Sequence, residues 1–443
     1  MLKRLCSFLL ILLFLLNLTV GVVLMPVQAK ANAKPGSKGK VVFWGGWLSP
    51  DDFKDFENET GYKVNYPERM VDMSKLIAAI ASGNAPDAIF IYLADARQLM
   101  GQGLLRPLDD FVAKSKDVSW NDFIPVTVKW GEYKGKHYLF PWDLNCDVLF
   151  WNRKMFEQAG LDPDRPPQTW DELLKLVKFF TKYNSEGKII QTGVGSAGNW
   201  GLDTFIWQLG ADWIDKNGRS QVKSTAIRKA VEFVLQLRKL ADPNVLGDKI
   251  DPKTQLGFDK QNVAMWIDDV VWRVNDIFRK TPGLDYDVTL LPVPKKGMKK
   301  GAVGYATWSL ALPQGSKNPQ AGFEIAKYFA TKVPYTWVSE GLKANKKNPA
   351  PYTIAYKKTL NLVKEILPQI QDPVHKRVMT HRIQILEKYT VYEVKDVLFN
   401  PRPIVDPILD KVWKGQMGVQ QALNEADKQL TAAILDYKKK MRK

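Results

Sequence analysis

The stretch that decides the fold class spans residues 40–91 and reads KVVFWGGWLSPDDFKDFENETGYKVNYPERMVDMSKLIAAIASGNAPDAIFI. Three of its segments are apolar or alternate between apolar and polar residues, which predicts β-strands. These segments are residues 40–44, 62–66 and 88–91. Between them, apolar residues at helical spacing predict helices over 50–60 and 73–82. This alternation predicts a mainly parallel sheet covered by helices, and therefore an α/β fold.

The same patterns continue along the rest of the chain. Apolar runs predict further short buried strands at 138–141, 148–151, 189–190, 263–266, 288–291 and 309–312. Helical spacing predicts helices at about 169–180, 203–210, 224–241, 319–331, 355–366, 374–389 and 417–437. Thr169 and Glu172 have the spacing of a reciprocal capping pair at a helix start. This number of strands fits two α/β lobes better than one very large sheet.

The first residues have the pattern of an export signal. Lys3 and Arg4 precede an apolar run over 5–25, and the small residues after it predict a cleaved signal peptide over 1–29. A basic linker over 30–40 follows. The apolar run is also long enough to remain as an uncleaved membrane anchor. With either outcome we expect an exported protein at the periplasmic or extracellular face of the cytoplasmic membrane.

The composition restricts the class of function. In 443 residues, 64 Lys and Arg against 47 Asp and Glu give a formal net charge of +17. No nucleic-acid-binding motif accompanies this charge, so we expect no nucleic-acid partner. The two Cys and three His residues lack metal-ligand spacing, so we expect no metal and no cofactor. The 15 Trp residues are the unusual feature, because each indole ring must be buried or used in binding.

Five stretches of the chain resemble the extracellular sugar-binding proteins of ABC importers, a family that includes maltose-binding protein. The stretches are 41–47, 80–87 with 103–108, 135–141 with 149–161, 167–173 and 262–267. The resemblance implies the type II periplasmic-binding-protein fold, in which hinge crossings join two α/β lobes and ligand is enclosed in the cleft between them. On this pattern we expect lobe 1 to comprise 41–147 and 305–345, and lobe 2 to comprise 148–304 and 346–443.

The resemblance also implies a function. It predicts the substrate-binding receptor of an ABC transporter, which captures a mono- or oligosaccharide and delivers it to the permease subunits in the membrane. Ligand that bridges both lobes favours the closed state, because only that state makes all the contacts. We therefore expect a binding protein that is not an enzyme and that acts as a monomer.

Sugar rings stack on indole rings, and sugar hydroxyls pair with Asp, Asn and Arg side chains. The candidate ligand-binding residues are accordingly aromatic and polar side chains in or beside loops at the ends of the predicted strands. They are Trp44, Trp47, Tyr92, Asp95, Trp142, Asp143, Asn145, Asn199, Trp200, Trp266, Asp268, Asp269, Trp272 and Trp308.

Some of these candidates have a structural alternative. Trp44 ends an apolar strand, so packing in the core is a rival role for it. Tyr92 and Asp95 compete for one ligand-contacting position, because the local chain length differs by a residue from the pattern of the family. Asp268 and Asp269 fit either a hydroxyl-rich or cationic ligand group, or the capping of a following helix.

Other functions remain as alternatives. Paired Asp residues and many Trp residues also occur in secreted glycoside hydrolases, whose two carboxylates must face each other across a site. Asp-rich and Trp-rich loops favour a polyamine ligand, whereas a phosphate ligand such as glycerol phosphate requires Arg or Lys in the cleft. Residues 193–198 match the dinucleotide glycine pattern, but its strand-helix-strand setting is not convincing.

Overall fold

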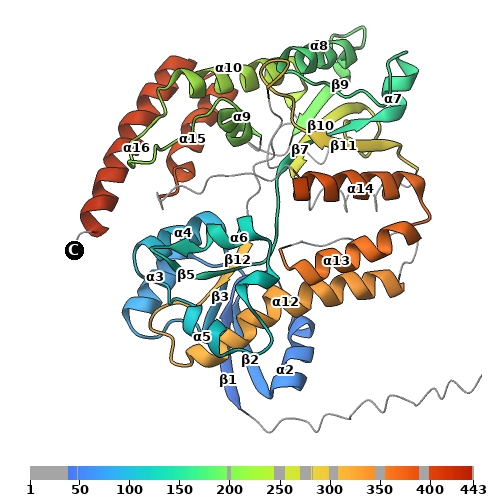
Figure 1. The fold of residues 1–443 in the computed structure, drawn as a ribbon. Helices are drawn as coiled ribbons and strands as arrows, with labels where there is room; N and C mark the ends of the chain where they lie inside the picture. The colour runs from blue at the N-terminus through green and yellow to red at the C-terminus, as the bar shows by residue number, and fades with distance from the viewer. Residues whose placement is uncertain are drawn as a thin grey trace, which may run out of the picture.

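The computed structural model describes residues 38–46, 48–196, 201–243, 255–269, 281, 283–298, 308–344, 355–388 and 399–441. Two five-stranded sheets lie at the centres of two bodies, which are stacked one above the other in Figure 1. We call the body around the first sheet lobe 1 and the body around the second sheet lobe 2. Among the helices that can be described, none is both long and apolar enough to cross a membrane.

The sheet of lobe 1 has the strand order β2-β1-β3-β12-β6. Its strands are β1 (Gly39–Trp44), β2 (Tyr62–Glu68), β3 (Ala88–Tyr92), β6 (Leu139–Pro141) and β12 (Trp308–Ala311). β1 runs parallel to both β2 and β3, which confirms the arrangement predicted for the first three strands. β12 is antiparallel to β3 and β6. Phe43 and Trp44 of β1 enter different apolar clusters, because successive residues of a strand point to opposite faces.

Helices cover both faces of this sheet. They are α2 (Lys54–Thr60), α3 (Met73–Ala81), α4 (Leu93–Gly101), α5 (Asp109–Lys114), α6 (Pro125–Trp130), α12 (Pro319–Ala344) and the short η1 (Pro50–Phe53) and η2 (Trp120–Asp122). A two-stranded ribbon pairs β4 (Glu132–Tyr133) with β5 (Lys136–His137). Gly45 follows the last residue of β1 at a φ of +91°, and a Cβ there would lie 2.1 Å from the carbonyl oxygen of Phe90. Only glycine lets the chain leave β1 so close to β3.

The sheet of lobe 2 has the strand order β11-β7-β10-β9-β8. Its strands are β7 (Asp147–Asn152), β8 (Lys182–Tyr183), β9 (Ile189–Ser196), β10 (Val263–Asp269) and β11 (Tyr286–Leu290). β10 is parallel to β9 and antiparallel to β7, and β11 is antiparallel to β7. The helices of this lobe are α7 (Arg153–Gln158), α8 (Trp170–Phe180), α9 (Leu202–Gln208), α10 (Thr225–Leu240), α14 (Pro373–Lys388), α15 (Arg402–Trp413) and α16 (Val419–Met441).

The start of α8 confirms its predicted cap with one difference. The Thr169 hydroxyl accepts a hydrogen bond from the Glu172 amide at 3.2 Å. The Glu172 carboxylate reaches back one residue further than expected, to the Gln168 amide at 2.8 Å. The helix then buries Trp170, Leu173, Val177 and Phe180 against the lobe 2 core.

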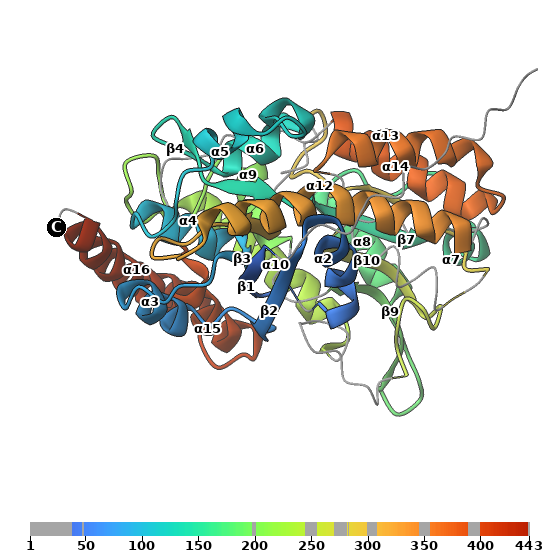
Figure 2. The same cartoon turned by 90° about the horizontal axis from the view of Figure 1, so that it is seen from below.

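The chain crosses between the lobes at residues 142–146, which join β6 to β7 and are all buried. A helical connection accompanies this crossing. α12 packs on the sheet of lobe 1 and on α13 (Lys357–Ile366), while η4 (Leu367–Gln369) leads on to α14, which packs on β11 of lobe 2. Figure 2 shows α12 running across the molecule, with α13 and α14 at its far end.

Several helices differ from the sequence prediction: the short helices α4, α5, α6 and α7 were not predicted, and neither the length of α12 nor the presence of α15 was expected. α12 extends to Ala344 instead of ending near residue 331, although Pro334 lies inside it. α15 was not predicted, since Pro403 and Pro407 interrupt its sequence pattern. Pro403 stands in the first turn, where proline needs no amide hydrogen bond. The four buried side chains of α15 are spaced along one face and pack in the core: Val405, Ile408, Leu409 and Val412.

Candidate ligand-binding site between the lobes

Aromatic side chains gather where β3 ends and β12 begins, at the edge of lobe 1. Trp308 pairs with Tyr92 across the two strands, and their rings make an edge contact at 5.8 Å. Phe90 stacks on Trp308 at 5.5 Å and meets Trp142 edge-on at 5.0 Å. Trp142 is buried, Trp308 is half-buried and Tyr92 is exposed over 41% of its surface. We call these four side chains the aromatic edge. Tyr92 and part of Trp308 are the members that a ligand can reach.

The interlobe crossing at residues 142–146 is hydrogen-bonded to this aromatic edge. The backbone amide of Trp308 donates to Asp143 Oδ1 at 3.0 Å, and the amide of Trp142 donates to the Trp308 carbonyl at 3.1 Å. Asp143 is fully buried. It thus orients the start of the crossing relative to Trp308.

On lobe 2, a guanidinium group is held between two carboxylates. Arg402 Nη1 donates to Asp203 Oδ1 at 3.3 Å, and Arg402 Nε lies 3.1 Å from Asp406 Oδ2. Asp203 also accepts a hydrogen bond from the indole nitrogen of Trp213 at 2.6 Å. Burial opposes the charge of Arg402, but Asp203 and Asp406 outweigh that effect and raise the pKa of the guanidinium.

Tyr92 of lobe 1 and Arg402 of lobe 2 lie close enough to interact electrostatically. Desolvation raises the pKa of Tyr92 to about 12, with Arg402 opposing the shift and Asp203, Asp95 and Asp147 adding to it. Two of these carboxylates, as well as the guanidinium, belong to lobe 2. A side chain that keeps 41% of its surface exposed yet is strongly desolvated lies in a recess surrounded by protein. Tyr92 therefore lines the space between the lobes.

A second polar contact joins the lobes beside this pair. Asp95, near the start of α4, makes a side-chain hydrogen bond with Asn400, which lies two residues before Arg402. Burial raises the pKa of Asp95, and the bond to Asn400 lowers it in part. The start of α15 is thus directed at the start of α4 across the interlobe space.

Asp147 lies where the crossing enters lobe 2. Its Oδ2 accepts hydrogen bonds from the Gly201 amide at 3.0 Å and from the Thr204 hydroxyl at 2.7 Å. Burial raises its pKa to about 6, since the two hydrogen bonds only partly offset desolvation and the nearby carboxylates of Asp203 and Asp268. This carboxylate anchors the first turn of α9 to the crossing.

The structure brings three sequence candidates to the interlobe space: Tyr92, Asp95 and Trp308. Six others are buried in this structure: Trp44, Trp142, Asp143, Asn145, Trp266 and Asp268. Trp44 packs among the apolar side chains of lobe 1 and Trp266 among those of lobe 2. The indole nitrogen of Trp266 donates to Asp268 at 2.9 Å, and Asn145 accepts from the Cys146 amide at 2.9 Å.

The remaining candidates lie outside the described residues: Trp47, Asn199, Trp200 and Trp272. Asp269 is placed only as the last residue of β10, where it pairs with Asp147. The roles assigned to all fourteen candidates stay predictions.

Sequence reasoning missed Asp203, Asn400 and Arg402 on the lobe 2 side of the site. Asp203 was not singled out because it is a single charged residue at the start of a predicted helix, and Arg402 was not because it lies in a Pro-containing stretch for which no helix was predicted. Asn400 lies in a Pro-containing stretch that gave no helical periodicity. Their role depends on contacts between segments about 200 residues apart, for which the sequence carries no local pattern.

The other chemistries considered find little support among the described residues. In the part of the chain with assigned positions, no group of three or more His, Cys, Asp and Glu side chains is arranged to hold a metal ion. A Cβ on Gly193 would lie 2.2 Å from the Val177 carbonyl oxygen, so close packing of β9 on α8 explains this glycine without a nucleotide.

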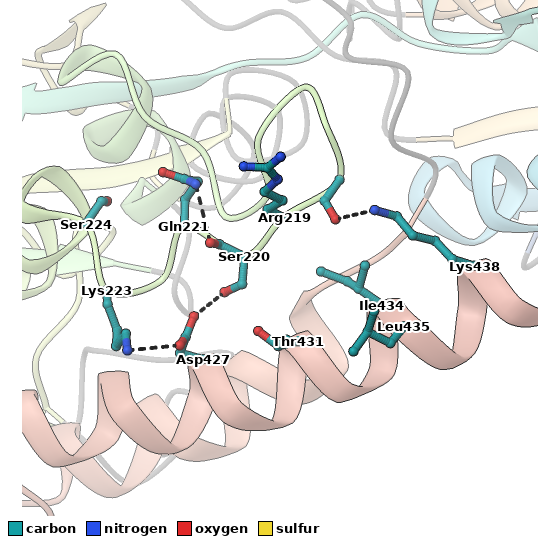
Figure 3. Close-up of a pocket in the computed structure, with 11 residues that line it drawn as sticks. Arg219, Ser220, Gln221, Lys223, Ser224, Asp427, Thr431, Ile434, Leu435 and Lys438 are labelled. Atoms are coloured by element: carbon teal, nitrogen blue, oxygen red, sulfur yellow. Dashed lines mark hydrogen bonds and ion pairs between the residues drawn. The ribbon is translucent and has the colours of Figure 1, made fainter.

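A surface cavity of about 580 Å³ lies elsewhere, between residues 218–224 and the second half of α16. Figure 3 shows that its polar side chains are largely engaged with one another or with the backbone. Asp427 binds Ser220 at 2.7 Å and Lys223 at 3.4 Å, and Lys438 donates to backbone carbonyls. We interpret the cavity as the groove in which the loop packs on α16.

Comparison with known proteins identifies the family that has this architecture. Residues 46–334, more than half of the chain, match the family model for the bacterial extracellular solute-binding protein. The sn-glycerol-3-phosphate-binding periplasmic protein UgpB of Escherichia coli K12 is 26% identical over 390 residues, which cover 84% of each chain.

Solved structures give the same fold. The mannobiose-bound CpMnBP1 structure superposes with a TM-score of 0.70 at 22% identity, over 89% of this chain and 100% of the other. The substrate-binding protein Lmo0181 of Listeria monocytogenes, in complex with cycloalternan, gives 0.69 at 19% identity, over 90% and 99%. The chain therefore has the two-lobed type II periplasmic-binding fold, with an interlobe cleft and hinge crossings. It belongs to the bacterial extracellular solute-binding protein family, whose members are binding proteins of ABC transporters rather than enzymes.

Proposed function

We propose that this protein is the receptor of an ABC importer that captures a neutral mono- or oligosaccharide between its lobes and delivers it to a membrane permease. The observation that carries the proposal is the meeting of an aromatic edge on lobe 1 with a carboxylate-held guanidinium on lobe 2. A sugar needs both, because its ring faces are apolar and its hydroxyls require fixed donors and acceptors.

The charge of the described interlobe residues favours a neutral ligand. Arg402 is already paired with Asp203 and Asp406, and Asp95 and Asp147 lie nearby. A phosphate group would bring further negative charge next to these carboxylates. Hydroxyl groups, by contrast, can donate to the carboxylates and accept from the guanidinium.

The similar proteins support this ligand class. Two proteins with a similar fold, CpMnBP1 and Lmo0181, were solved with the carbohydrates mannobiose and cycloalternan bound. A second candidate ligand is sn-glycerol 3-phosphate, which the name of the Escherichia coli relative gives as its ligand. Arg402 is the observation that favours it, because a guanidinium group is the usual partner of phosphate.

A thermal-shift series separates the two candidates. A ligand that binds only the folded state raises the melting temperature progressively with its concentration. We expect stabilisation by one or more of mannobiose, maltotriose and D-mannitol. Stabilisation by sn-glycerol 3-phosphate alone would contradict the neutral-sugar proposal, and consumption of any of these compounds would support a hydrolase.

Arg402→Gln sharpens this test. Loss of the guanidinium should weaken sugar binding by about ten-fold, the size of one or two charge-assisted hydrogen bonds. It should abolish glycerol-phosphate binding altogether. Arg219→Gln is the matched control, because Arg219 is an exposed arginine at the α16 groove and not between the lobes.

We also propose the lobe limits 41–147 with 305–345 and 148–304 with 346–443, a monomeric state, and an amino-terminal segment 1–29 that is either cleaved or kept as an anchor. The sheets agree with these limits to within one residue, since β7 of lobe 2 begins at Asp147. Amino-terminal sequencing of the exported protein distinguishes cleavage from anchoring, and light scattering measures the oligomeric state.

A further inference from the structure

Asp147 connects two parts of the molecule that ligand binding must coordinate. It is the first residue of β7, directly after the buried crossing 142–146, and only 5% of its surface is exposed. It accepts the Gly201 amide and the Thr204 hydroxyl at the start of α9.

α9 in turn carries the residue that holds Arg402. Asp203 is the second residue of α9, and its carboxylate accepts hydrogen bonds from Arg402 and from Trp213. Three successive contacts therefore lead from the crossing to the cleft: Asp147 to α9, Asp203 to Arg402, and Arg402 to the vicinity of Tyr92.

We propose that Asp147 is a positioning residue for ligand binding: its ionised carboxylate holds α9 against the hinge crossing and thereby sets Asp203 and Arg402 in the cleft. This inference rests on the proposed function, because it assigns Arg402 a part in ligand capture. Protonation of Asp147 exchanges two charge-assisted hydrogen bonds for weaker neutral ones and loosens the position of α9.

The surroundings of Asp147 make that protonation accessible in mildly acidic conditions. Among the described residues, the charged and titratable groups around it include Asp203 of α9, Asp268 of β10, Arg402 of α15 and Tyr92 of β3. Burial and the two carboxylates outweigh the hydrogen bonds and raise its pKa to about 6. Ligand affinity is therefore expected to fall as the pH drops from about 7.5 to about 5.

Two variants test separately the charge of Asp147 and the hydrogen bonding that positions α9. Asp147→Asn keeps the shape of the side chain but removes its charge, and Thr204→Val removes one donor to Asp147 and leaves the charge in place. With whichever of mannobiose, maltotriose, D-mannitol or sn-glycerol 3-phosphate binds the wild type, each variant should bind about five-fold more weakly at about pH 7.5. Asp147→Asn should also flatten the pH dependence.

The melting temperature, compared with the ligand affinity, distinguishes a positioning role of Asp147 from a merely structural one. Because burial disfavours the ionised carboxylate, Asp147→Asn should keep or raise the melting temperature at about pH 7.5 while it weakens binding. Asp287→Asn is the control, since Asp287 is a buried carboxylate of the same lobe that bonds His381 and lies away from α9. It should lower the melting temperature and leave the affinity unchanged.

Amide hydrogen exchange of α9 tests the inference without ligand. At about pH 7.5, exchange in residues 202–208 should be faster in Asp147→Asn and in Thr204→Val than in the wild type, because each variant weakens the hydrogen bonds that hold the start of α9. Equal protection of α9 in the wild type and both variants would overturn the positioning role. If no probe binds the wild type, the proposed ligand classes fail, and the exchange result still decides the role of Asp147.

Discussion

At the scale of single residues, the interlobe site depends on side chains that are surrounded by both lobes. Tyr92 is the clearest example, since it stands at the end of a lobe 1 strand but takes its strongest charged neighbours from lobe 2. The sequence places Tyr92 among the candidates because it follows a buried strand. It does not predict Arg402 opposite, because the two residues are 310 positions apart and no local pattern connects them.

Tyr92→Ala tests the aromatic edge. Removal of an aromatic face that a sugar contacts should weaken ligand binding by about ten-fold. The change in stability should be small, because the ring is exposed over 41% of its surface. Titration calorimetry measures the affinity, with Tyr183→Ala as the control, since Tyr183 is an exposed tyrosine on β8. Equal loss of affinity in both variants would contradict a specific role for Tyr92.

His381 gives a pH-dependent contribution to stability. Its Nδ1 lies 2.8 Å from Asp287 Oδ1, and this hydrogen bond raises its pKa above the ordinary value of 6.5. Protonated His381 is thus favoured in the folded state. Its stabilisation is fully present below pH 6.5 and is lost as the pH rises through the raised folded-state pKa.

His381→Gln should therefore be less stable than the wild type in mild acid and equal to it in alkaline solution. We expect a difference of only about 0.5 kcal/mol, because the imidazole is partly exposed and water screens the pair. Urea unfolding of both proteins at about pH 5.5 and about pH 8.5 measures it. A deficit that grows as the pH rises would contradict the sign of the shift.

At the scale of elements, regular patterns predict the structure well, and tertiary packing decides the exceptions. The first three strands, α8 and α10 follow from periodicity and caps that are local to each segment. α15 does not, because packing of its apolar face outweighs the loss of a hydrogen bond at Pro407. α12 continues through Pro334 in the same way, and its buried Val333 packs in the lobe 1 core.

Thr169→Ala tests the cap of α8. The hydroxyl satisfies an amide that the helix itself leaves without a partner, so its loss should lower the free energy of unfolding by about 1 kcal/mol. Thr169→Ser keeps the hydroxyl and should be close to the wild type. Denaturant unfolding measures both, and a Ser variant as unstable as the Ala variant would show that the methyl group matters instead of the cap.

At the scale of the whole molecule, the two sheets, the buried crossing and the α12–α14 connection produce two joined bodies. The strand and helix patterns along the chain predict two α/β lobes, and the resemblance to the sugar-binding proteins of ABC importers implies the crossings between them. It predicts the site only in part, since the cleft is formed by the approach of distant segments. Several candidates prove to be buried beside it, as Asp143 is beneath Trp308.

The central claim is that a neutral sugar binds between the lobes and draws them together. Small-angle X-ray scattering of the exported protein, with and without a saturating concentration of the sugar that gives the largest thermal shift, tests it most directly. We predict a smaller radius of gyration in the presence of the sugar, and no such change in a variant with both Tyr92→Ala and Arg402→Gln. An unchanged radius of gyration while the sugar is bound would contradict the account.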